Sequence, residues 1–470
     1  MAPMLKFTVQ VSKPELIRPE KPTPREFKYS SNIDDQKGLK NHIPFVRFYP
    51  PSTASSHTHD QEPVGLIKQA LARALVYYYP MAGRLRHADK GKLVVDCCGE
   101  GVIFREGNAD IKLAQLREAD GGLKPPFPQW ESLLVDDLWG SVLITDSPLL
   151  RMQVIRLACG GFVLAYTLNH CICDAYGACI LIKAISEFCL NPTQVAPSLL
   201  PAWGRQALHP RSPPTISYPH HECDVTSSSP HDPEDPTAAY TETDFKSLAQ
   251  TSVFLSQADI SSLKNQTYSQ KSPAFHAIAG CLWRARTRTL MSPQSTTRLL
   301  FPIDTRFRST PSLPEGYYGS AVVFACAIAN TGELVDSPLH CASNLISQVK
   351  KVVTENEYRA SMLDFIEMNR RRELVADGGF AVSDMSKLRF VDLDFGWGKG
   401  VYGGPGRAGT GLVPGMVTSV IGHKNEEGVE GVLALVSLPA EYVGKFRKEV
   451  RKEIDCGNIL MPNIFLHCRG

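Results

Sequence analysis

The chain has 470 residues, of which 43% are hydrophobic and 21% are charged. These fractions are typical of a soluble globular protein and exclude a disordered, collagenous or coiled-coil chain. Its 50 Lys and Arg residues nearly balance 48 Asp and Glu residues, so charge gives no reason to expect binding to nucleic acid or to an anionic membrane.

The first part of the chain predicts a mixture of helices and strands. Apolar residues at helical spacing predict the first helix, and β-branched or aromatic runs predict the strands that follow. Asp174 occupies the N-cap position of the helix that comes next. In chain order, these elements are a helix at 63–79, strands at 92–97, 152–157 and 161–168, and a helix at 175–188.

A proline-rich stretch at 191–240 divides the chain into two similar-sized halves. It holds ten of the 34 prolines, and proline prevents a helix or central strand from continuing. We therefore expect an N-terminal domain at 1–190, a crossover at 191–240 and a C-terminal domain at 241–470.

The second half again mixes helices and strands, so the predicted fold class is mixed α/β. Two runs across the polar turn at 424–428 predict a β-hairpin. The expected elements are helices at 256–268 and 273–288, a strand at 298–302, hairpin strands at 417–421 and 432–438, and a helix at 440–453.

Cysteine usage and the chain start favour a reduced compartment. Thirteen unevenly spaced cysteines do not suggest a disulfide framework, and residues 1–10 lack the features of a secretory signal. The most apolar stretch, 161–185, contains His170, Asp174 and Lys183, which are costly in lipid. We therefore expect a cytoplasmic protein without membrane contacts.

The segment 169–177 (NHCICDAYG) places a histidine at the end of the predicted buried strand and an aspartate four residues later. A rigid strand-to-helix corner suits a general base, and an imidazole pKa of about 6.5 lets His170 accept and return a proton near neutrality. The spacing alone leaves a second interpretation open, in which His170 is a hydrogen-bonded core residue and Asp174 only caps the helix.

A second segment, 392–411 (DLDFGWGKGVYGGPGRAGTG), runs from an aromatic and glycine core into a glycine-dense loop. Its formal GxGxxG lacks the βαβ unit and the acidic residue of a dinucleotide site. The glycines favour close backbone packing or a hinge beside a ligand channel.

His170 with Asp174, and the DFGWG run at 394–398, together resemble the two defining motifs of the plant BAHD acyl-CoA-dependent acyltransferases. The resemblance spans nearly the whole chain, and its extensions look most similar to the alcohol acyltransferase and benzyl alcohol O-benzoyltransferase branch. Other segments that read like this family are 33–36 (IDDQ), 77–86 (YYYPMAGRLR) and 314–319 (PEGYYG).

This resemblance implies a monomer with two chloramphenicol-acetyltransferase-like domains and a channel between them. His170 would remove the proton of an alcohol while its oxygen attacks the thioester of an acyl-CoA such as benzoyl-CoA, forming an ester. The co-substrate acyl-CoA and the alcohol would be the only partners, and no permanently bound cofactor or metal is implied. An amine acceptor, or a silent family member that acts only as a binding protein, are the alternatives.

The resemblance also implies roles for individual residues. The Trp397 indole N–H is a candidate donor to the oxyanion, and Asp174 would pair with Arg306 and hold the corner in shape. Asp394 and Gly396 would support the site, and Lys271, Ser272 and Arg308 would contact the CoA phosphates. Tyr176 stands where the family commonly has a small residue: it would narrow the acceptor pocket if it faces the channel, and would not affect specificity if it faces the helix core. Arg407 is a second candidate for this pocket.

A zinc or redox site is not expected. The pair Cys171 and Cys173, and the run 220–223 (HHEC), both lack a second ligand pair at the spacing of structural zinc. The two cysteines of the first pair are interpreted as buried small residues.

Overall fold

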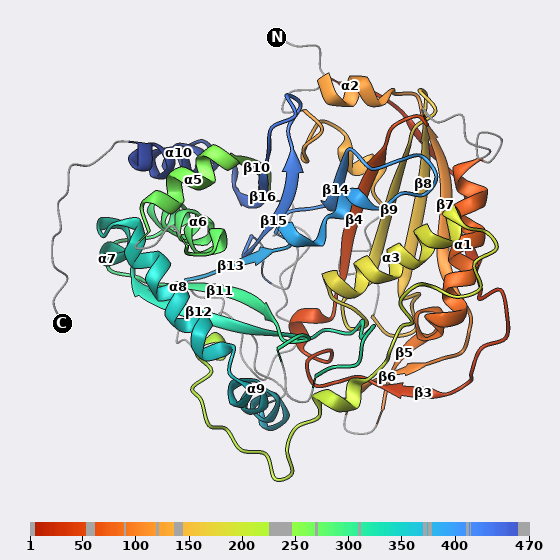
Figure 1. Ribbon diagram of the computed structural model, residues 1–470, viewed down its shortest axis with the longest axis horizontal. Helices are drawn as coiled ribbons and strands as arrows, with labels where there is room; N and C mark the ends of the chain where they lie inside the picture. Colours follow the sequence, from red (N-terminus) through yellow and green to blue (C-terminus); the bar gives the residue numbers. More distant parts are fainter. Residues whose placement is uncertain are drawn as a thin grey trace.

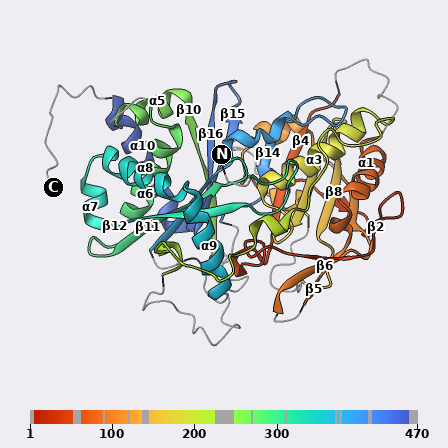
Figure 2. The same cartoon turned by 60° about the horizontal axis from the view of Figure 1, so that its bottom comes forward.

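The computed structural model describes residues 5–52, 62–88, 91–118, 122–135, 144–224, 247–267, 271–308, 312–369, 374, 378–409, 413 and 415–458. Two β-sheets, each with its own helices, lie side by side (Figure 1). Figure 2 shows the same two sheets after rotation, with α9 (Asn356–Met368) near their junction. The fold is therefore mixed α/β, as predicted.

The first sheet has seven strands in the order β1-β7-β8-β9-β4-β14, with β2 also paired to β7. Helices α1 (Pro63–Tyr77) and α3 (Ala175–Leu190) pack side by side on one face (Figure 1). The strands are β1 (Val9–Val11), β2 (Glu15–Ile17), β4 (His42–Tyr49), β7 (Val102–Ala109), β8 (Leu150–Leu157), β9 (Phe162–Asn169) and β14 (Tyr402–Pro405).

A small sheet and a short helix complete the first half. The three strands run in the order β3-β6-β5. Their bounds are β3 (Phe27–Tyr29), β5 (Arg84–His87) and β6 (Leu93–Asp96), and the short helix is α2 (Leu113–Glu118).

The second sheet has six strands in the order β10-β16-β15-β13-β11-β12. Its core is built around Trp283, which is fully buried on α6. The strands are β10 (Leu248–Ser256), β11 (Thr296–Asp304), β12 (Val322–Asn330), β13 (Gly379–Asp384), β15 (Val417–Lys424) and β16 (Glu430–Pro439). The helices are α5 (Gln257–Asn265), α6 (Ala274–Leu290), α7 (Thr331–Asp336), α8 (Leu339–Val353) and α10 (Val443–Asn458).

The two halves share a sheet. Strand β14, from the second half, pairs antiparallel with β4 of the first half, and Tyr402 lies opposite Phe48. Because β14 occupies the edge position next to β4, the first sheet is complete only when the second half supplies this strand.

Most elements predicted from the sequence are confirmed with small shifts of their ends. The last helix begins at Val443 after a 3-10 turn at Ala440–Tyr442, slightly later than predicted. Residues 191–224 contain only short 3-10 turns among the helical types, including η5 (Arg205–Leu208), whereas 225–240 lie outside the described residues. Sequence patterns missed the strands β1, β2, β3, β4, β5, β7, β10, β12, β13 and β14 and the helices α2, α7 and α8.

Among the described residues, no helix is both long and apolar enough to cross a bilayer.

Candidate active site

His170 lies at the corner where β9 turns into α3. Its backbone N–H donates to the carbonyl of Asn41 at 2.9 Å, and the N–H of Cys171 donates to the side-chain oxygen of Asn169 at 3.0 Å. These two bonds turn the chain sharply after the strand. They leave the His170 side chain half-buried rather than enclosed in the core.

The surroundings of the His170 ring favour its neutral form. Burial lowers its pKa, although its own backbone and the carboxylates of Asp174 and Asp34 act in the opposite direction. Its Nδ1 is enclosed and has no hydrogen-bond partner among the described residues. A neutral imidazole is the protonation state that can accept a proton.

Both carboxylate oxygens of Asp174 accept hydrogen bonds from neighbouring groups. One carboxylate oxygen accepts from the Gly177 N–H at 3.0 Å and so caps α3. The other accepts from Arg306 Nη2 at 2.7 Å and from the Ala321 N–H at 3.3 Å. Asp174 therefore ties the start of α3 to the second half of the chain.

Arg306 is buried, with its side chain only 3% exposed. Besides Asp174, its guanidinium contacts Asp304 at 3.1 Å and donates to the carbonyls of Tyr317 and Gly319. The ring of Tyr176 lies over this guanidinium at 4.8 Å and meets Phe307 edge-on at 5.8 Å. Tyr176 thus packs against the Asp174–Arg306 pair.

The DFGWG loop is built around Asp394. Its carboxylate accepts from the N–H groups of Gly396 at 2.7 Å and Gly398 at 2.8 Å. Both glycines have positive φ values, 104° and 83°, which residues with a Cβ rarely adopt. The Asp394 carbonyl also accepts from Ser186 on α3 at 2.5 Å, so the loop is fastened to the first half.

The Trp397 ring packs on the start of β9, and its predicted role as oxyanion donor stays a prediction. This ring packs edge-on against Phe162 at 5.4 Å between centroids, and Phe162 is the first residue of β9, whereas His170 follows the last. At about 3.3 Å per residue, eight steps along an extended strand separate these two positions by roughly 26 Å. The indole therefore lies at the far end of the strand from the corner at His170.

The residues expected to contact CoA lie in the second half. Lys271 and Ser272 precede α6, and Arg308 is exposed after β11. Two further cations, Lys350 and Lys387, were not singled out from the sequence. Burial lowers the pKa of Lys350, and the charges of Arg308 and Lys387 lower it further, whereas Asp384 acts in the opposite direction.

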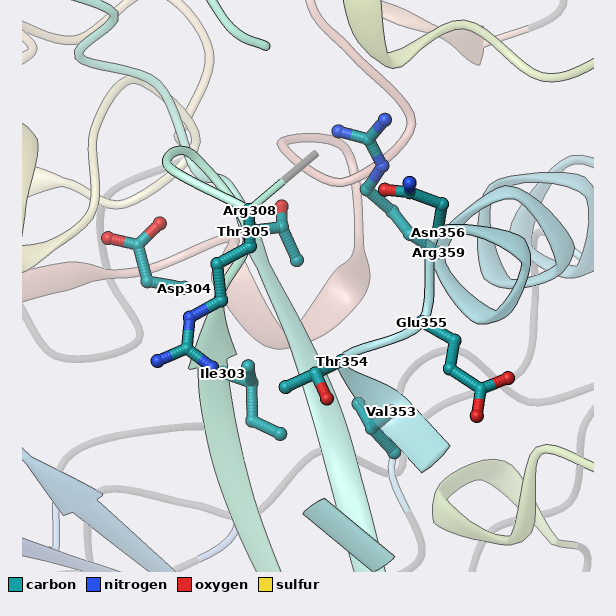
Figure 3. A pocket seen from close by; sticks show the side chains of 9 residues that line it. All are labelled: Ile303, Asp304, Thr305, Arg308, Val353, Thr354, Glu355, Asn356 and Arg359. Atoms are coloured by element: carbon teal, nitrogen blue, oxygen red, sulfur yellow. The ribbon is translucent and has the colours of Figure 1, made fainter. Parts of the chain in front are cut away.

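Arg308 also lines a small pocket that is partly open to solvent. Figure 3 shows Arg308 on the wall formed by the end of β11 and Arg359 on the opposite wall, at the start of α9. Arg359 is 7% exposed and its Nη1 has no partner among the described residues.

Arg407, expected in the acceptor pocket, follows β14. Its guanidinium lies 3.8 Å from Glu131, and the neighbouring Gly406 N–H donates to the Pro44 carbonyl at 2.7 Å. Arg407 therefore lies beside β4 and separately from Tyr176, which packs on Arg306.

The buried cysteines near His170 carry little thiolate. Burial raises the pKa of both Cys171 and Cys173, and a thiol with a raised pKa is a poor nucleophile. Among the residues that the structure describes, no group of three or more His, Cys, Asp or Glu side chains is arranged to hold a metal ion. His220 instead hydrogen-bonds Glu222 and Ser361.

Comparisons with known proteins cover nearly the whole chain. The model of the Transferase family matches residues 7–453. The benzyl alcohol O-benzoyltransferase of Petunia hybrida is 39% identical over 449 residues, covering 95% of this chain and 94% of that protein. The piperamide synthase of Piper nigrum is 36% identical over 455 residues, with 95% and 94% coverage.

A solved structure with the same fold is that of vinorine synthase. It superposes with a TM-score of 0.71 at 20% identity and covers 95% of this chain and 98% of that one. At this identity the likeness concerns the fold.

Proposed function

The chain belongs to the BAHD acyltransferases of the Transferase family, and we propose that it transfers an acyl group from an acyl-CoA to an alcohol with His170 as the general base. One observation carries this proposal. A half-buried histidine with a lowered pKa stands at a corner that is fixed by the buried Asp174–Arg306 pair.

In this mechanism the neutral imidazole takes the hydroxyl proton while the alcohol oxygen forms a bond to the thioester carbonyl carbon. The tetrahedral oxyanion then collapses and the carbon–sulfur bond breaks. The imidazolium returns its proton to the departing CoA thiolate, so all protons balance. The raised pKa of Cys171 and Cys173 favours this direct transfer over an acyl-cysteine intermediate.

Asp174 acts in this scheme as a positioning residue. Its two oxygens are occupied by the cap of α3 and by Arg306, so the carboxylate holds the corner and does not touch the substrate. Its negative charge also raises the pKa of His170 and so acts against the effect of burial.

The CoA phosphates are proposed to bind at the basic cluster of Arg308, Lys350 and Lys387, with Lys271 and Ser272 beside α6. Phosphate groups bind best where charged donors converge. The pKa of Lys350 is lowered by burial and then by Arg308 and Lys387, with Asp384 acting in the opposite direction, so a bound anion beside these cations would be stabilised. Lys350→Ala should therefore raise KM for acyl-CoA while leaving kcat nearly unchanged.

Benzoyl-CoA and benzyl alcohol are the substrates we propose first, because a relative named benzyl alcohol O-benzoyltransferase matches 95% of the chain. An amine acceptor is the second candidate. It is favoured by the piperamide synthase, which matches the chain at 36% identity, and the same base serves both reactions.

The test is release of CoA thiol by the wild type and by His170→Ala, with benzoyl-CoA or acetyl-CoA and a panel of alcohols and amines. We expect alcohol-dependent ester formation that falls at least about 100-fold in the variant, the scale of a lost general base. Mass spectrometry identifies the product. His340→Ala is the matched control, because His340 is also half-buried but lies on α8.

The possible outcomes are distinct. If an amide forms and no ester forms, the acceptor is an amine and not an alcohol. A folded wild type that releases no acceptor-dependent thiol would contradict catalysis and favour a silent binding protein. Equal activity of His170→Ala and wild type would remove the general base from the mechanism.

A further inference from the structure

A second buried aspartate–arginine pair lies at the catalytic corner, opposite Asp174 and Arg306. Arg205 Nε donates to Asp34 Oδ2 at 3.2 Å, and the two side chains are 2% and 0% exposed. Asp34 comes from the N-terminal segment before β4, whereas Arg205 comes from the crossover. Neither residue was given a role on the basis of the sequence.

The two aspartates hold consecutive backbone groups of one loop. Asp34 accepts from the Ser320 N–H at 3.0 Å, and Asp174 accepts from the Ala321 N–H at 3.3 Å. The Ser320 hydroxyl in turn donates to the His170 carbonyl at 3.4 Å. The loop before β12 is therefore fixed between the two carboxylates and touches the backbone of His170.

Arg205 contacts the catalytic corner directly. Its Nη2 donates to the carbonyl of Ile172, two residues after His170, and its Nη1 donates to the Trp203 carbonyl at 3.0 Å. The guanidinium lies over the Trp203 ring at 3.8 Å and the Tyr318 ring at 4.8 Å. These contacts determine where the carbonyl of Ile172 can lie.

The backbone of this region is shaped to admit the guanidinium. A Cβ at Gly319 would lie 2.5 Å from the Arg205 guanidinium carbon, so only glycine leaves room for it. Three chain segments thus meet at Arg205: the N-terminal segment, the crossover and the loop before β12.

Stability alone is a weak explanation for such a pair. Removing two charges from water costs about as much as their attraction returns, and buried pairs often contribute little net stability. An arginine guanidinium can instead fix the positions of the groups it contacts, because its hydrogen bonds have fixed directions.

We propose that Asp34 and Arg205 are positioning residues for the acyl transfer, which hold the turn from His170 to Ile172 in register with the loop at 319–321. This inference rests on the proposed function for its kinetic consequences. It also makes the crossover part of the catalytic frame, because the crossover supplies Arg205.

The experiment compares Arg205→Met, Arg205→Lys and Asp34→Asn with the wild type. We expect kcat to fall about 10- to 100-fold in Arg205→Met, the scale of a misplacement near 1 Å, with KM for acyl-CoA changed less than about threefold. Arg205→Lys should be intermediate, because an ammonium retains the charge but not the fork.

A titration of the His170 ring, followed by NMR of ¹³C-labelled histidine, supplies a readout that needs no turnover. Asp34 raises the pKa of His170 in the wild type. Arg205→Met leaves the Asp34 charge uncompensated and should raise the pKa of His170, whereas Asp34→Asn should lower it. Both variants should nevertheless reduce kcat.

Arg284→Met is the matched control. Arg284 pairs with Glu453 at 3.1 Å, and the side chains are 6% and 5% exposed, but this pair joins α6 to α10. It should lower the thermal midpoint without moving the His170 titration or kcat.

The outcomes separate the two proposals. A folded Arg205→Met with wild-type kcat and His170 titration would overturn the inference, and so would an equal kcat loss in Arg284→Met. A wild type without acyl transfer would refute the proposed function alone, because the titration of His170 still decides whether Arg205 acts on it. If Arg205→Met fails to fold, Arg205→Lys and Asp34→Asn decide by the same criteria.

Discussion

Gly177 offers the sharpest steric test of the corner between β9 and α3. It is buried in the first turn of α3, where its N–H donates to Asp174. A Cβ at this position would lie 1.9 Å from the carbonyl oxygen of Tyr318 and 2.8 Å from the Cβ of Cys173. Ordinary contact begins near 3.4 Å, so Gly177→Ala requires the two backbones to separate by about 1.5 Å.

This displacement should affect both stability and turnover. Alanine favours a helix by about 1 kcal/mol over glycine, but overpacking against a fixed carbonyl costs about 1–3 kcal/mol, so we expect net destabilisation. A shift of more than 1 Å beside His170 should reduce kcat roughly 100-fold. The assays are urea unfolding and steady-state kinetics with the substrate pair found for the wild type.

Gly444→Ala is the matched control, because nothing lies within 4 Å of a Cβ at this position in α10. It should raise the free energy of unfolding by up to about 1 kcal/mol and leave kcat unchanged. If Gly177→Ala retains both the wild-type kcat and the wild-type stability, the prediction is wrong, because the corner would then have accommodated the added Cβ without loss of turnover or stability.

Three further predictions follow from the geometry. Trp397→Phe should keep kcat within about threefold of the wild-type value, because an aromatic ring still packs on Phe162. A loss of about 100-fold would indicate that the indole N–H stabilises the oxyanion. The acid limb of the kcat/KM profile should have its midpoint below 6.5, because burial lowers the pKa of His170 and protonation removes the base; a midpoint at or above 6.5 would contradict this. The free energy of unfolding should fall as the pH drops from 6.5 towards 4, because burial lowers the pKa of His276 and His423 to about 4. The unfolded chain binds these protons at a higher pH than the folded chain does. Each histidine therefore contributes up to about 3 kcal/mol to the free energy of unfolding above pH 6.5, and this contribution is lost in acid. Urea unfolding at pH 7.5 and 5 measures the loss, and His423→Gln should reduce it.

Local elements were predictable where several signals coincide. The strand ending at Asn169 has a fully buried apolar run, and α3 has a cap at Asp174 and apolar residues at helical spacing. The resemblance to a family added the partner of Asp174, because Arg306 lies 132 positions away and no local pattern joins the two. The corner itself was therefore predicted well.

The remaining features of the site depend on contacts that a sequence window does not contain. Asp34 and Arg205 are 171 residues apart, and neither stands in a pattern that marks it as buried. The place of Trp397 is likewise set by contacts distant in sequence, since its motif is fastened to α3 and to Phe162. A charged residue in a proline-rich segment reads as exposed until the fold encloses it.

The position of β14 has a consequence for synthesis of the chain. Strand β4 ends at Tyr49, and its partner begins at Tyr402, so about 350 residues are translated between them. At roughly 5–20 residues per second, the interval is roughly 20–70 s. During that time a nascent first half presents the unpaired edge of a buried strand, a template for wrong pairing. Folding on the ribosome should therefore require a chaperone or a temporary cover for this edge, and slowing translation should increase aggregation.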